Sequence, residues 1–150
     1  MHANNKWKKG FYTLVNPDKY LGDIDNVVFR SSWEEEAFKV LDNNPKILAW
    51  ASEEIQIPYP KPLPDGNYSR GVYTPDLFVV KEETDGSITR QLIEIKPYKQ
   101  TIPSKARTPH VKLQEQYQYS VNQHKWAAAK AWCDQYGIIF SIVTEKDMFV

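Results

Sequence analysis

One stretch limits what this 150-residue chain can fold into. Residues Arg70–Val80 and Ile88–Lys96 alternate in polarity and are rich in β-branched side chains, which predicts two strands. Between them, Glu82–Ser87 contains Asp85-Gly86, a common hairpin turn signal. Pro75 lies inside the first strand, which indicates a sheet edge or a bulge there. The chain is therefore predicted to fold around an antiparallel hairpin.

The hairpin carries three charged side chains that suit metal-assisted chemistry. Glu94 and Lys96 are two residues apart, so in a strand they point to the same face, while Ile95 points to the other. Asp76 lies on the neighbouring strand. Carboxylate oxygens bind hard divalent cations such as Mg²⁺, and a lysine orients water or stabilises developing negative charge. This arrangement favours a magnesium-dependent phosphodiesterase.

A third carboxylate precedes the hairpin. Ser31-Ser32 is a helix start signal before an apolar-periodic run to Asn43, with one apolar arc at about 100° per residue. The arc consists of Trp33, Ala37, Phe38, Val40 and Leu41. Glu34 falls inside it, where a bound metal would offset the cost of burying the charge. Glu35 and Glu36 fall outside it and favour the positive end of the helix, although the run leaves Glu35 as an alternative ligand.

The remaining chain completes a mixed α/β pattern. Residues 1–30 form an aromatic N-terminal arm with little regular structure, including Trp7, which packs on the body or on a partner. Residues 31–150 form the second unit. The expected elements there are strands at Ile47–Trp50 and Ile55–Tyr59, a loop at 60–68, a basic loop at Lys99–Pro109, a helix at Val111–Tyr136 ended by Gly137, and a strand at Ile138–Val143. The order predicts a largely antiparallel meander.

Composition excludes several other chemistries. One cysteine, Cys133, excludes an intrachain disulfide or a multi-cysteine zinc site. The three histidines lack metal-ligand spacing, and neither a glycine-rich phosphate loop nor a nucleophile elbow is present. Lys and Arg total 19, as do Asp and Glu, so the chain has no net positive charge that would indicate a nucleic acid partner. No run reaches transmembrane length, and Met1 opens no signal-peptide pattern.

Longer motifs resemble a known family. Asp76, Glu94 and Lys96 with an upstream helical glutamate resemble the PD-(D/E)xK nuclease superfamily, restriction-endonuclease-like in fold. The chain resembles most the head-completion nucleases of tailed phages, which are similar to transposon-end endonucleases. The matching runs are Arg30-Ser31-Ser32-Trp33-Glu34, Ser52-Glu53-Glu54-Ile55, Ile57-Pro58-Tyr59, Tyr73-Thr74-Pro75-Asp76-Leu77, Ile93 to Gln100, and Asn122-Gln123 with Lys125-Trp126. Together they cover roughly residues 8–147.

The resemblance implies a restriction-endonuclease-like mixed sheet flanked by helices, and a metal-dependent deoxyribonuclease. The active-site set carried over by position is Glu34, Asp76, Glu94 and Lys96, with the three carboxylates binding Mg²⁺, or Mn²⁺ as a substitute. The enzyme would trim or protect packaged DNA ends during head completion, before tail attachment, in the virion or host cytoplasm. Expected partners are DNA and head, portal or neck proteins, with no membrane.

Basic and amide side chains after the second strand are expected to meet DNA. Phosphate contacts are assigned to Lys99, Lys105, Arg107 and Lys112, and orientation of the scissile phosphate to Gln114 and Gln118. The alternative function is a structural plug or connector of the head or neck with little turnover, docked through the arm. A further alternative is a metal-free peptide-binding domain, in which the acidic cluster is solvated.

Overall fold

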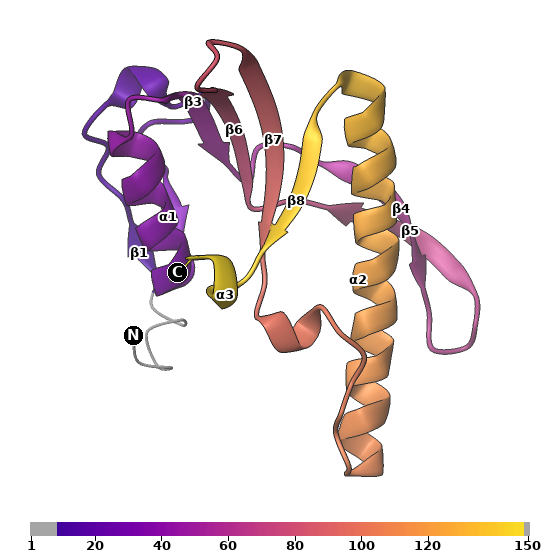
Figure 1. Ribbon diagram of the computed structural model, residues 1–150. Helices are drawn as coiled ribbons and strands as arrows, with labels where there is room; N and C mark the ends of the chain where they lie inside the picture. The colour runs from indigo at the N-terminus through magenta and orange to yellow at the C-terminus, as the bar shows by residue number, and fades with distance from the viewer. Residues whose placement is uncertain (1–8, 149–150) are drawn as a thin grey trace.

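A four-stranded mixed sheet forms the centre of the protein. The computed structural model describes residues 9–148. The sheet runs in the order β3 (Ile47–Ser52), β6 (Leu77–Glu82), β7 (Ile88–Ile95) and β8 (Ile139–Val143), as Figure 1 shows. Its first three strands are antiparallel, whereas β8 runs parallel to β7. The predicted restriction-endonuclease-like mixed sheet is therefore confirmed, but the predicted meander ends at β7.

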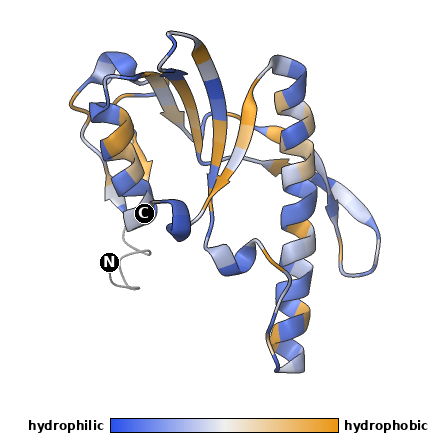
Figure 2. Cartoon of the chain, in the orientation of Figure 1, coloured by the Kyte–Doolittle hydropathy of each residue, from blue (hydrophilic) through white to orange (hydrophobic). Residues whose placement is uncertain are grey.

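Helix α2 (Pro109–Tyr136) makes the parallel pairing possible. Two parallel neighbours need a long crossover, and α2 carries the chain from the end of β7 back to the start of β8. Gly137 ends the helix with φ +68°, a left-handed conformation that glycine adopts without penalty. The predicted helix, its end and the following strand are confirmed. Figure 2 shows mostly polar residues in the N-terminal half of α2, which extends past the sheet.

The two long helices cover opposite faces of the sheet. On one face, Phe38 and Leu41 of α1 (Ser32–Asn43) pack with Trp50, Leu77 and Val79. On the other face, Trp126, Ala129 and Cys133 of α2 join a second cluster that includes Leu92 of β7. None of the helices in residues 9–148 is long and apolar enough to span a membrane.

Helix α1 begins as predicted, but its buried face is shifted. The Ser31 hydroxyl accepts a hydrogen bond from the Glu34 backbone N–H at 3.1 Å, which caps the helix. Val40, predicted on the buried arc, is 59% exposed. Asp42 lies at the other side of that arc and is fully buried. The arm covers the Asp42 side and so displaces the buried face away from Val40.

The described part of the arm packs on the body, as predicted. It contains the short strands β1 (Gly10–Phe11) and β2 (Val28–Phe29) and the 3₁₀ turn η2 (Pro17–Lys19). Tyr20, Val27 and Phe29 are buried in the same cluster as α1 and β3. The prediction for Trp7 lies outside the described residues.

Asp42 fixes the arm to α1. Its carboxylate accepts hydrogen bonds from the Tyr12 hydroxyl at 2.8 Å and from the backbone N–H groups of Val15 and Asn16 at 2.7 and 3.0 Å. Burial by itself raises the pKa of Asp42, but these donors outweigh it and hold the pKa below its usual range. The ionised carboxylate therefore stabilises the fold.

One predicted strand is in fact two. The structure has β5 (Tyr68–Tyr73) and β6 in place of a single strand over Arg70–Val80, because the chain breaks at Thr74–Asp76, around Pro75. Strand β5 pairs with β4 (Ile57–Pro62) in a separate hairpin. Strands therefore occupy both ends of the predicted 60–68 loop, and only residues 63–67 form the turn between them.

The β4–β5 hairpin lies against α2 (Figure 1). The Tyr117 hydroxyl of α2 donates a 2.7 Å hydrogen bond to the Pro62 carbonyl. Prolines occupy alternate positions of β4, namely Pro58, Pro60 and Pro62, so the N–H groups available for pairing with β5 come from Ile57, Tyr59 and Lys61. The opposite edge of β4 consequently offers no N–H donors at those three positions.

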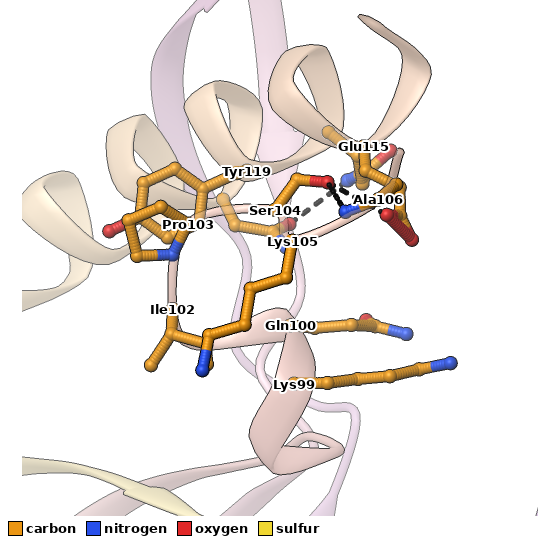
Figure 3. A pocket seen from close by; sticks show the side chains of 11 residues that line it. Lys99, Gln100, Ile102, Pro103, Ser104, Lys105, Ala106, Glu115 and Tyr119 are labelled. Carbon is orange, nitrogen blue, oxygen red and sulfur yellow. Dashed lines mark hydrogen bonds between the residues drawn. The ribbon is translucent and has the colours of Figure 1, made fainter. Parts of the chain in front are cut away.

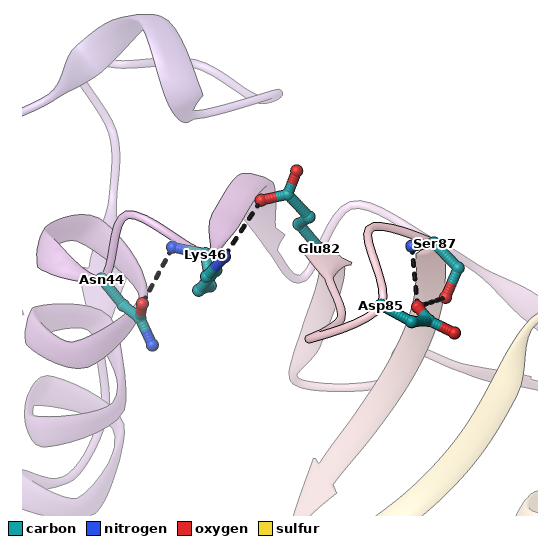
Figure 4. A network of polar contacts seen from close by, with 5 residues as sticks. All are labelled: Asn44, Lys46, Glu82, Asp85 and Ser87. Atoms are coloured by element: carbon teal, nitrogen blue, oxygen red, sulfur yellow. Dashed lines mark hydrogen bonds and ion pairs between the residues drawn. The ribbon is translucent and has the colours of Figure 1, made fainter.

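Polar contacts hold the end of the sheet opposite the Asp76 end of β6. Figure 4 shows Lys46 pairing with Glu82 at 3.3 Å, which links the α1–β3 connection to the end of β6. In the predicted β6–β7 turn, Asp85 accepts hydrogen bonds from the backbone N–H and hydroxyl of Ser87. Gly86 follows with φ +86°. The Asp85–Ser87 contacts stabilise the turn that joins β6 to β7, and the Lys46–Glu82 pair connects β6 to the α1–β3 connection.

We expect Asp42→Ala to destabilise the protein by about 3 kcal/mol, since hydrogen bonds to a charged group contribute about 1.5–3 kcal/mol each. Urea unfolding measures this. Because the pKa of Asp42 is depressed in the folded state, its contribution is present above the unfolded pKa of about 3.9 and is lost as pH falls through the folded pKa. The exposed Asp25→Ala variant serves as the control. An equal loss in both variants would contradict this role.

Candidate active site

Two carboxylates meet where β6 begins and β7 ends. Leu77 pairs with Ile93, so Asp76 just before β6 lies beside Glu94. The sequence predicts Asp76 within a strand, but it lies in the break after Pro75, and its Oδ2 accepts a 2.6 Å hydrogen bond from the Ile95 N–H. That bond holds the carboxylate against β7.

Successive side chains of β7 point to opposite faces of the sheet, so the site residues lie on the opposite face from the α1 cluster. Ile93 and Ile95 pack against the cluster beneath α1. Leu92 belongs to the α2 cluster, so Glu94 and then Lys96 project to that side. Glu94 is only 6% exposed, and its Oε2 lies 3.7 Å from Lys96 Nζ. The predicted placement of Glu94 and Lys96 on one face is confirmed.

Ionising Asp76 beside Glu94 is unfavourable in the free protein. Burial raises the pKa of Asp76 well above its usual range, and the field of Glu94 adds to the rise, while the Ile95 N–H opposes it. Two crowded carboxylates of this kind are a suitable pair of ligands for a hard divalent cation. Among residues 9–148, no three His, Cys, Asp or Glu side chains come close enough together to hold a metal ion.

Glu34 of α1 is a third carboxylate that acts on the Asp76–Glu94 pair. Its Oε1 accepts a 2.9 Å hydrogen bond from the Arg30 N–H. Burial raises its pKa, and the fields of Glu53 and Glu94 add to the rise, whereas the Arg30 N–H lowers it. The field of Glu34 in turn raises the pKa of Asp76. The charge of Glu34 therefore acts on Asp76, and the charge of Glu94 acts on Glu34.

The neighbouring glutamate lies elsewhere. The field of Glu35 acts on the Tyr12 hydroxyl of the arm, whose pKa is raised first by burial and then by its hydrogen bond to Asp42. Of the two candidates, Glu34 is thus the one electrostatically connected to Asp76 and Glu94.

Most of the predicted DNA-contacting residues lie away from the carboxylates. Lys99, Lys105 and Gln118 line a cavity of about 330 Å³ between the basic loop and α2 (Figure 3). Gln118 donates to Asn122 at 3.0 Å, which occupies its amide. The other three, Arg107, Lys112 and Gln114, are exposed in the loop and the first turns of α2. None of the six makes a hydrogen bond or ion pair with Asp76 or Glu94 in the described part of the chain.

Three other residues approach the pair instead. Lys125 and Trp126 come from α2, and Tyr73 ends β5. Lys125 Nζ lies 5.8 Å from the centroid of the Tyr73 ring, and Glu94 and Asp76 act on Lys125 electrostatically. Helical spacing predicts Trp126 in the core and gives Lys125 and Tyr73 no role. Both stand in runs that carry the family resemblance, which is the only signal that could have found them.

The comparisons with known proteins decide the family. The model of a family described as "TnsA-like endonuclease N terminal" matches residues 44–145, a span that includes Asp76, Glu94 and Lys96. The chain belongs to this family. It is also 36% identical over 146 residues to the "Head completion nuclease" of Enterobacteria phage T4, covering 93% of this chain and 92% of that protein. The resemblance inferred from the sequence motifs is confirmed.

We expect Asp76→Asn to raise the melting temperature of the metal-free protein at pH 7.5. The raised pKa means that folding disfavours the ionised form, so the penalty is present at neutral pH and disappears below the ordinary Asp pKa of about 4. Asparagine can still accept the Ile95 N–H. Calorimetry in EDTA at pH 7.5 and pH 3.5 measures the difference.

The exposed Asp25→Asn variant should show no gain at either pH. A lower melting temperature for Asp76→Asn than for wild type at pH 7.5 would show that the ionised carboxylate stabilises the free protein, contrary to expectation.

Proposed function

We propose that the protein is a metal-dependent deoxyribonuclease that hydrolyses phosphodiesters of packaged DNA during phage head completion. The observation that carries the proposal is the buried Asp76–Glu94 pair with Lys96 on the same face, in a chain of the TnsA-like endonuclease family. The named phage relative supports head completion as the setting.

Asp76 and Glu94 would hold Mg²⁺, with Mn²⁺ as a substitute, and Glu34 would complete the ligand set directly or through water. The bound ion supplies acidification of water and neutralisation of charge on the phosphate. The raised pKa of Asp76 supports this assignment, because its ionised form is unfavourable until a cation binds. Because Oε1 of Glu34 accepts the Arg30 N–H, Oε2 would be the oxygen that Glu34 offers to the ion.

Lys96 would orient the attacking water or take its proton. Its ammonium lies 3.7 Å from Glu94 and only partly in solvent, so it stays at the carboxylates rather than sampling many rotamers. A fixed cation there also offsets charge that develops on the phosphate oxygens.

The basic loop and the start of α2 would supply contacts that do not read sequence. Lys99, Lys105, Arg107 and Lys112 are cations of this region, suited to phosphate groups. Gln114 and Gln118 are the residues expected to orient the scissile phosphate. The hydrogen bond of Gln118 to Asn122 favours a role for Gln118 in supporting the loop instead.

A structural role in the head or neck is the second candidate, and one observation favours it. The arm exposes apolar side chains, with Phe11 72% and Val15 66% exposed. Such side chains suit docking onto a head, portal or neck protein, in the virion or in the host cytoplasm. The two roles are compatible, and a well-folded Lys96→Ala variant separates them: head completion fails in that variant if the chemistry matters and succeeds if the role is only structural.

Lys96→Ala should lower the rate of DNA cleavage in Mg²⁺ by about 10²–10⁴-fold, the usual contribution of a positioned proton-transfer group. Cleavage of linear and supercoiled DNA by purified protein measures this, with EDTA as the metal-free arm. Lys81→Ala removes an equal charge from a distant, exposed position of β6 and should leave the rate unchanged. Cleavage by the wild-type protein in EDTA would refute the proposed mechanism. Cleavage by Lys96→Ala at the wild-type rate would refute it as well.

Mg²⁺ should raise the melting temperature of the wild-type protein, because a ligand that binds only the folded state stabilises it by about 2.7 kcal/mol at 100 times its dissociation constant. Glu94→Gln should lose most of this rise, since one ligand oxygen and its charge are gone. Glu36→Gln, on the exposed side of α1, is the matched control and should keep it. An equal rise in all three proteins would place the ion elsewhere.

A further inference from the structure

Lys125 is a cation without an ionic partner at the edge of the candidate active site. It is half-buried on α2, and its ammonium faces the ring of Tyr73 at 5.8 Å. Within residues 9–148, no carboxylate lies in ion-pairing distance of it. Lys130 of the same helix differs, because it is solvent-exposed and forms an ion pair with Asp134 at 2.8 Å. Partial desolvation of this ammonium costs stability, and the Tyr73 ring and the charges of Glu94 and Asp76 offset only part of that cost.

Two buried donors next to Lys125 also lack partners. Tyr73 is 3% exposed, and its hydroxyl makes no hydrogen bond; the same is true of the Trp126 indole N–H in this part of the structure. The Tyr73 hydroxyl lies beside Glu94 and Trp126, and both act on its pKa as hydrogen-bonding neighbours, although neither contact meets the usual hydrogen-bond geometry. Buried donors are normally satisfied, so these long contacts hold Tyr73 and Trp126 only weakly beside Glu94.

Two other cations act on Lys125 from neighbouring elements. Partial burial lowers the pKa of Lys125, and the fields of Lys96 after β7 and Lys61 on β4 lower it further, while Glu94 and Asp76 oppose this. Ile57 and Tyr59 of β4 pack in the α2 cluster. Lys61 is exposed and comes two residues after Tyr59, so it projects from the same face of β4, toward α2. Like charges gathered in this way suit a row of phosphates, each of which relieves the repulsion.

We propose that Lys125 and Lys61 form a phosphate-binding subsite beside the Asp76–Glu94 pair. The ligand is the sugar-phosphate backbone of the DNA strand that is cut, and the subsite directs it from Lys96 across α2 onto the β4–β5 hairpin. This inference rests on the proposed nuclease function, but it assigns the DNA a path that differs from the basic loop. Lys125 and Lys61 position the strand and take no part in bond breaking.

A purely structural role for Lys125 makes the opposite prediction. If the lysine only packs its alkyl stem against α2 and the hairpin, then Lys125→Met preserves the packing and DNA binding alike. If it binds phosphate, the same variant weakens DNA binding while the free protein melts at the same temperature or higher, because an unpaired, partly buried charge is gone.

The test measures duplex DNA binding by fluorescence anisotropy over a series of salt concentrations, with Ca²⁺ in place of Mg²⁺. Each phosphate contact contributes about 0.9 to the slope of log affinity against log salt concentration. We expect Lys125→Met and Lys61→Ala each to reduce that slope by about one and to weaken binding several-fold. Lys125→Arg should restore both.

Lys130→Ala is the matched control, since it removes the same charge from the same helix. The subsite is overturned if Lys125→Met binds with the wild-type slope, or if Lys130→Ala lowers the slope as much. It is equally overturned if wild type does not bind DNA.

A different result is expected if the subsite is real but the nuclease proposal is wrong. The wild-type protein would then bind DNA with a salt-dependence slope that depends on Lys125, yet it would cut no DNA in Mg²⁺ or Mn²⁺. If wild type cuts and the subsite is real, Lys125→Met should raise KM more than it lowers kcat.

Discussion

The position of β7 between two hydrogen-bonded neighbours is the constraint on which the other elements depend. With β6 on one side and β8 on the other, every side chain of β7 must project above or below the sheet. Ile93 and Ile95 thereby complete the core beneath α1, and Leu92 completes the core beneath α2. The same alternation brings Glu94 to the α2 side, where it is held among apolar neighbours. A shift of one residue in the β6–β7 register would exchange the faces, so the core and the site are specified together.

The site is assembled from charges that the free protein does not balance. Asp76 and Glu94 crowd each other at the end of the sheet, and Lys125 faces an aromatic ring without a counterion among the described residues. The arm shows the contrasting case, because Asp42 is also buried but receives three hydrogen bonds. One buried carboxylate thus stabilises the fold, while another is kept at a cost in stability, as expected for groups that a metal ion and a phosphate would neutralise.

Sequence patterns predict the local elements well and the long-range arrangement partly. Periodicity locates α1, α2, β7 and β8, and the alternation of side chains along a strand is enough to place Glu94 and Lys96 on one face. It does not separate β5 from β6, because Pro75 is equally compatible with a bulge inside one strand. It also places Val40 on the buried face, since the packing of the arm against Asp42 is a contact over more than twenty residues of chain. Lys125 and Tyr73 escape such patterns for the same reason: their proximity to Glu94 is created by the crossover and the β4–β5 hairpin, which local patterns do not describe.

The three alternate prolines of β4 limit how other molecules can meet the hairpin. An extended peptide joins a sheet by exchanging backbone hydrogen bonds with its open edge, and Pro58, Pro60 and Pro62 have no N–H to offer there. Strand addition by a second copy, or by a stretched segment of another protein, is blocked on that side. Along the β4 edge, other molecules can therefore contact the hairpin only through its side chains, and that edge cannot start aggregation by strand pairing.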